Sequence, residues 1–120
     1  MNASAFRRAE AIENLESYSR IIVVHLALVT LFPENPAKDH WDAELNAFKK
    51  TLKRYDKAKK RDHNFTRQII IETLGDECID YDAKDAILIA VEGHGVKAPD
   101  NPDWNIINKA IESFADSIME

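Results

Sequence analysis

The sequence predicts an all-α protein, a single-domain bundle of about five helices over residues 1–120, with a long second helix and antiparallel neighbours. Apolar residues recur at spacings of three and four along several stretches, which is the period of an amphipathic helix. The chain has only three Gly and four Pro in 120 residues, which favours long regular elements over many turns. No stretch shows the alternating pattern of a partner β-strand.

Composition places the chain among globular proteins, with 45% hydrophobic and 31% charged residues. The net charge of −5 is unevenly spread. Residues 49–61 hold eight basic side chains and one acid, a local charge of +7, whereas residues 72–120 hold twelve acids and three lysines, a local charge of −9. The overall acidity argues against a protein whose sole purpose is to coat nucleic acid.

The first helix is expected from about Ser4 to Leu31, where Pro33 stops it. One stripe carries its apolar residues, and the stretch from Ile21 to Leu28 is apolar nearly all round, which is typical of a helix buried on several sides. We therefore expect this helix to be central. A β-strand over the same stretch is the competing interpretation, because β-branched residues favour strands. A second subunit of a homodimer is an alternative cover for this helix.

The second helix is expected over residues 36–60, with Asn35 as its N-cap and Pro36 at its first position. Spacings of 4, 3, 4 and 3 place five apolar side chains on one stripe: Trp41, Leu45, Phe48, Leu52 and Tyr55. This stripe predicts the face that packs against the core.

Asn64 is expected to cap a third helix over residues 65–74, and Gly75 to close it as a C-terminal glycine. Residues 76–82 then form an acidic loop that contains Cys78 and Ile79.

Asp82 is expected to cap a fourth helix that ends near Glu92, before Gly93-His94-Gly95. Asn101-Pro102 repeats the Asn-Pro opening and predicts the start of a last helix. That helix carries an apolar stripe at helical spacing: Trp104, Ile107, Ile111, Phe114 and Ile118.

The second helix presents a basic face opposite its apolar stripe, made by Lys50, Lys53, Arg54, Lys57, Lys60 and Arg61. A solvated face that keeps a long helix in solution is the simplest interpretation. An acidic protein partner and nucleic acid are the alternatives, since phosphate contacts need clustered Lys and Arg. No aromatic residue interleaves this face, and a membrane surface is a weaker fit because Trp41 and Phe48 serve the core.

The second charged feature is an acidic surface formed by Asp76, Glu77, Asp80, Asp82 and Asp85. Spaced carboxylates can ligate Ca²⁺ or Mg²⁺, but the alternating ligands, central Gly and terminal Glu of a calcium loop are absent. We expect no metal here. The acidic surface is better suited to a basic partner, or to the basic helix itself.

No catalytic residue is predicted. The four histidines lack the i, i+4 spacing of a helical zinc site, and His25 occupies a core position where a hydrogen-bonded structural role is expected. Cys78 stands among acids, which should raise the pKa of its thiol and make it unreactive. No Gly-rich loop could cradle a phosphate, so no cofactor is expected.

The stretch from Val23 to Leu45 resembles a pattern in a bacterial helical family known as domain of unknown function twenty-nine. In that pattern an apolar helix with His-Leu is followed by Pro-Glu and by a Trp that begins a basic helix. Here His25-Leu26, Pro33-Glu34 and Trp41 stand in those places, with the Trp shifted by about one residue and the Arg-rich loop before it missing. The resemblance covers about a fifth of the chain, and it implies a helical bundle with no assigned activity.

These observations favour a non-enzymatic protein that binds a protein partner through a charged surface. Small, acidic, single-domain inhibitors, immunity proteins and regulators of bacteria and phages share this size and charge. A nucleic-acid-binding module that uses the basic face is the first alternative, and an enzyme with a site assembled from distant helices is the second. The lone Cys78, the lack of a signal core and an apolar run too short to span a bilayer predict a cytoplasmic protein with no membrane contact.

Overall fold

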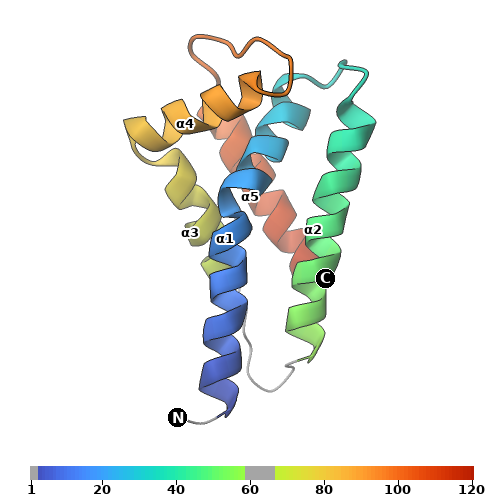
Figure 1. Cartoon of the computed structure of the whole chain (residues 1–120), viewed down its shortest axis with the longest axis vertical. Helices are drawn as coiled ribbons and strands as arrows, with labels where there is room; N and C mark the ends of the chain where they lie inside the picture. The colour runs from blue at the N-terminus through green and yellow to red at the C-terminus, as the bar shows by residue number, and fades with distance from the viewer. Residues whose placement is uncertain (1–2, 59–66) are drawn as a thin grey trace.

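The computed structural model describes residues 3–58 and 67–120, with side chains described over 13–54 and 67–120. Throughout this part of the chain every regular element is a helix, and the prediction of an all-α bundle is confirmed (Figure 1). The elements, in chain order, are α1 (Ala3–Leu31), α2 (Lys38–Ala58), α3 (Arg67–Gly75), the short 3₁₀ helix η1 (Asp76–Cys78), α4 (Tyr81–Glu92) and α5 (Trp104–Met119).

Helix α1 lies at the centre of the bundle and packs against α2, α3, α4 and α5. Every side chain from Ile22 to Leu28 is buried, which confirms the central helix and shows the β-strand interpretation to be wrong. The chain's own helices provide this cover. The reason for expecting a second subunit over this helix therefore falls away.

Helix α2 runs antiparallel to α1 (Figure 1). Trp41, Leu45 and Leu52 are buried along its predicted stripe, and Phe48 is half-buried against the core. The side chain of Tyr55 lies outside the described side chains. The stripe is therefore confirmed as far as Leu52, because residues at this spacing return to the same side of a helix.

The start of α2 differs from the prediction by two residues. The side-chain oxygen of Asn35 accepts a hydrogen bond from the Ala37 amide at 2.8 Å, and its carbonyl accepts one from the Lys38 amide at 3.0 Å. Asn35 thus caps a turn that contains Pro36 and leads into the helix. The regular helix begins at Lys38.

Helix α3 ends at Gly75, as predicted, but Gly75 is not in the left-handed conformation of a C-terminal glycine. Gly75 has φ −63° and ψ −31°, which is ordinary right-handed helix, and α3 passes through it directly into η1. The predicted acidic loop therefore begins as a helical turn, and Cys78 is buried at its end. The predicted cap Asn64 and first residue Phe65 lie outside the described residues.

Helix α4 lies across one end of the bundle, and a long connector leads from it to α5, which crosses behind α1 (Figure 1). The N-cap of α5 is Asp103, whose carboxylate accepts a hydrogen bond from the Asn105 amide at 3.0 Å. The expected Asn-Pro opening is therefore wrong. Four of the five stripe residues of α5 are buried, and Trp104 is half-buried.

Candidate functional site

The five carboxylates of the predicted acidic surface are not equivalent. Glu77 is already engaged, because it accepts hydrogen bonds from Arg20 at 2.8 Å and from the Ser19 hydroxyl at 3.3 Å. Only 19% of the Glu77 side chain is exposed, against 51% of Arg20. This ion pair links η1 to α1. Glu77 therefore stabilises the fold and is a weaker candidate for contact with a partner.

Asp80 is the N-cap of α4. Its carboxylate accepts a hydrogen bond from the Ala83 amide at 2.7 Å, which satisfies one of the free amides at the start of the helix. The prediction that Asp82 is the cap is wrong. Asp82 lies in the first turn, where a negative charge favours the positive end of the helix dipole.

Asp76, Asp82 and Asp85 remain as exposed carboxylates. None of them takes part in the ion pairs formed within the described part of the chain. The acidic surface therefore consists of three carboxylates open to solvent beside two that hold the local structure.

A second feature of this region is apolar, and sequence reasoning missed it. Ile79, Tyr81 and Ile89 are 71%, 80% and 64% exposed, the three most exposed large hydrophobic side chains of the described residues. Tyr81, Asp85 and Ile89 follow one another at spacings of four, so they share one side of α4. We call the set of Ile79, Tyr81, Asp82, Asp85 and Ile89 the α4 surface.

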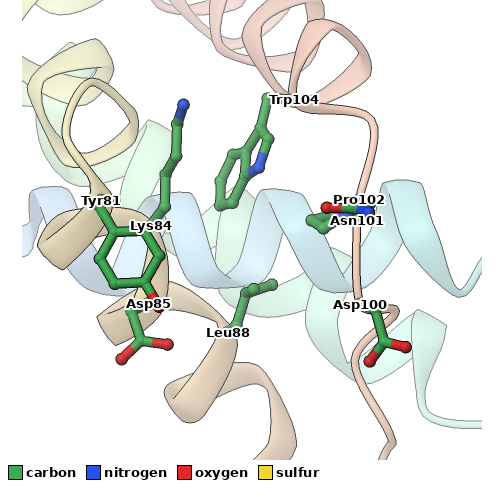
Figure 2. A pocket seen from close by; sticks show the side chains of 8 residues that line it. All are labelled: Tyr81, Lys84, Asp85, Leu88, Asp100, Asn101, Pro102 and Trp104. Atoms are coloured by element: carbon green, nitrogen blue, oxygen red, sulfur yellow. The ribbon is translucent and has the colours of Figure 1, made fainter.

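Beside the α4 surface lies a cavity of about 380 Å³. Figure 2 shows the side chains of α4 and of residues 100–104 that face it. The Lys84 ammonium lies 5.6 Å from the centre of the Trp104 ring, within cation–π range. Trp104 was predicted to be a core residue, but it forms part of a cavity wall as well.

The basic face of α2 is only partly within the described side chains. Lys50 and Arg54 are exposed and Lys53 is half-buried, whereas the Lys57 side chain and the residues Lys60 and Arg61 lie outside that part. None of the three described cations forms an ion pair with a described acid. The idea that the acidic half of the chain neutralises this face finds no ion pair to support it among these residues.

Two histidines meet where α1 faces the connector after α4. His25 is buried, and its Nδ1 lies 2.8 Å from the Ile21 carbonyl oxygen, so the predicted structural role is confirmed. The His94 ring lies 5.4 Å from the His25 ring, centre to centre. Partial burial, and then the nearby His25 and His40, lower the pKa of His94 below its ordinary value.

In the described part of the chain, no group of three or more His, Cys, Asp and Glu side chains is arranged to hold a metal ion.

Cys78 is buried at the end of η1. Burial raises the pKa of its thiol to about 11, and the neighbouring Glu77 charge acts in the same direction. The direction agrees with the prediction, but desolvation is the larger cause. A thiol in this state is a poor nucleophile.

No protein-family model, curated protein or solved structure matches this chain. Across the described residues, no helix has both the length and the apolar character needed to cross a bilayer. The function must therefore be inferred from the surfaces of the molecule. The α4 surface is the strongest candidate, because it combines exposed apolar side chains with carboxylates that lack an ion-pair partner among the described residues.

Proposed function

We propose that this chain is a non-enzymatic protein-binding module and that it docks a protein partner through the α4 surface. The exposure of Tyr81 and Ile89 on one side of α4 carries the proposal. Exposed apolar side chains are ordinary when scattered singly, but two on one side of a helix that also lines a cavity favour an interaction site. Tyrosine is also enriched among the residues that dominate binding energy.

The charges of the α4 surface indicate the chemistry of the partner. Asp82 and Asp85 flank the apolar side chains, and both are exposed. A complementary partner would present apolar side chains surrounded by Lys or Arg, because opposite charges accelerate encounter and select the partner. The acidic balance of residues 72–120 favours the same class of partner.

The test compares two variants. The double variant Ile79→Ser/Ile89→Ser removes two exposed apolar side chains without touching the core. Ile106→Ser is the matched control, because Ile106 is also exposed, at 44%, but lies on α5 outside the α4 surface. The tagged chain is cross-linked in its own cells, the captured protein is purified, and its affinity for each variant is measured by calorimetry.

We expect the double variant to bind at least about ten-fold more weakly and the control to bind as the wild type does, as expected when interface anchors are lost. Equal affinity of the double variant and the wild type would overturn the proposal. Sedimentation of the purified chain provides a second criterion: self-association that the double variant abolishes would show the surface to be a homodimer interface instead of a site for another protein.

Nucleic acid is the second candidate partner, through the basic face of α2. Lys50 and Arg54 support it, because both are exposed and neither is paired with a described acid. A short duplex should then shift in a mobility assay at low salt, the affinity should fall steeply as salt rises, and Lys50→Glu/Arg54→Glu should abolish the shift. Absence of a shift for the wild type at low salt would reject this candidate.

A further inference from the structure

The cavity beside the α4 surface is lined by two separate parts of the chain. Helix α4 contributes Tyr81, Lys84, Asp85 and Leu88, the segment before α5 contributes Asp100, and the first residue of α5 contributes Trp104 (Figure 2). Its volume of about 380 Å³ is small. Pockets that enclose small molecules measure about 300–1,000 Å³, so this one lies near the lower end of that range and has room for a single long side chain.

The Trp104 ring already interacts with a cation. The Lys84 ammonium lies 5.6 Å from its centre, so this face of the indole attracts positive charge in the free protein. Lysine keeps its charge on a flexible four-carbon stem, and the Lys84 ammonium can therefore leave the ring at little cost.

Two carboxylates also line the cavity. Asp85 and Asp100 lie on opposite walls, both are exposed, and neither belongs to an ion pair of the described residues. With Lys84 on the ring, the three charged lining residues sum to −1. When its ammonium moves away from the ring, the cavity presents an aromatic face and two negative charges without a counter-ion.

We propose that this cavity receives an arginine side chain of the protein partner, and that Lys84 occupies the cation position on Trp104 until the arginine displaces it. A guanidinium is planar and weakly hydrated, so it stacks on an aromatic ring and donates paired hydrogen bonds to a carboxylate at the same time. A lysine ammonium can lie over the ring, but it cannot donate paired hydrogen bonds to a carboxylate in the same way. This inference rests on the proposed function, and it specifies which partner side chain enters the cavity.

Lys84 gives the proposal a distinctive consequence. If it competes with the incoming arginine, Lys84→Ala strengthens binding, by about two- to five-fold for a cation–π contact at an exposed site. If Lys84 were instead a contact for an acidic partner, the same substitution would weaken binding. Asp85→Asn and Asp100→Asn should each weaken arginine binding about two- to five-fold, as expected for exposed ion pairs.

The experiment is an NMR titration of the ¹⁵N-labelled full chain with the blocked tripeptide Gly-Arg-Gly. The chain has two tryptophans, and Trp41, which is 2% exposed, provides an internal reference. The Trp104 indole signal should shift in a saturable manner while the Trp41 signal stays in place. The same tripeptide with citrulline, which has the arginine shape without its charge, should leave both signals unchanged.

Three results would each overturn the inference: no shift of Trp104, equal shifts with citrulline, or weaker binding by Lys84→Ala. Failure here is distinguishable from failure of the proposed function, because Ile79 and Ile89 do not line the cavity. A partner that requires Ile79 and Ile89 while the tripeptide leaves Trp104 unchanged would reject only the arginine site. A tripeptide that binds while no partner depends on Ile79 and Ile89 would reject only the docking function.

Discussion

Replacing Gly75 by alanine should stabilise the protein, whereas replacing Gly95 by alanine should destabilise it. Gly75 has φ −63° and ψ −31°, and Gly95 has φ +87°. At both positions, apart from the adjoining chain itself, no atom lies within 4 Å of the place that an added Cβ would take. The two sites therefore differ in backbone conformation and not in steric room, so each substitution is the control for the other.

The magnitudes follow from the backbone. Ala fits the helical conformation at Gly75 and restricts the unfolded chain, so Gly75→Ala should raise the free energy of unfolding by about 0.5–1 kcal/mol. At Gly95 a left-handed Ala costs about 1–2 kcal/mol, partly offset by the same unfolded-state effect, which leaves a net loss of about 1 kcal/mol. With about 2.1 cal/mol/K of unfolding entropy per residue, 1 kcal/mol corresponds to about 4 °C in a chain of this length.

Urea unfolding followed by circular dichroism at 222 nm measures both effects, with thermal melts as a second reading. The midpoints should move in opposite directions at an unchanged m-value. If Gly75→Ala destabilises the protein as much as Gly95→Ala does, Gly75 ends α3 in a left-handed conformation. That result would refute the continuous passage from α3 into η1.

Three further predictions concern single side chains. Asp80→Ala should lower the free energy of unfolding by about 1 kcal/mol in a urea titration, because an amide of α4 loses its hydrogen-bond acceptor. Asp80→Asn should keep the cap and the stability, and a larger loss for Asp82→Ala would show that Asp82 is the cap. The thiol of Cys78, whose pKa is raised to about 11, should react with iodoacetamide at pH 8 at least about ten-fold more slowly in native protein than in urea; equal rates would contradict its burial. The pKa of His94 is lowered in the folded protein, so as the pH falls below the ordinary value of 6.5 the unfolded chain binds a proton on this histidine before the folded protein does. The titration of His94 therefore leaves the free energy of unfolding unchanged above that pH and lowers it below that pH. His94→Asn should reduce the slope of stability against pH between about 6.5 and 5, and an unchanged slope would show that His94 titrates normally.

The amphipathic stripes could be predicted from the sequence because burial repeats every three or four residues. Trp41, Leu45 and Leu52 are buried as the spacing required, and Ile107 and Ile111 likewise. The central position of α1 followed from the same rule. Side chains that are apolar on every side of a helix need neighbours on every side.

Helix ends were less predictable, because several residues near each end could form the cap. Asp80 and Asp82 are equally good N-cap residues, and only the backbone decides which carboxylate meets a free amide. Asn101 and Asp103 present the same choice at α5. Gly75 can end a helix or continue one, and its neighbours in sequence do not distinguish the two.

The candidate site was the hardest part to predict. The acidic residues of α4 were found from charge alone, but the exposed apolar side chains among them were not. Helix α4 has apolar residues around most of its circumference, and tertiary packing decides that Ile87 and Val91 are covered while Tyr81 and Ile89 are not. The Lys84–Trp104 contact joins residues twenty positions apart, which no local pattern can reveal.

The central position of α1 also has a consequence for how the chain folds. Helix α1 precedes every helix that covers it, so a growing chain exposes the Ile22–Leu28 segment before any partner helix exists. Its packing with α5 has to wait until about 90 more residues have been made, which at about 5–20 residues per second takes roughly 5–20 seconds. During that interval the Ile22–Leu28 segment is an exposed apolar surface, and a chaperone that shields nascent chains should bind it.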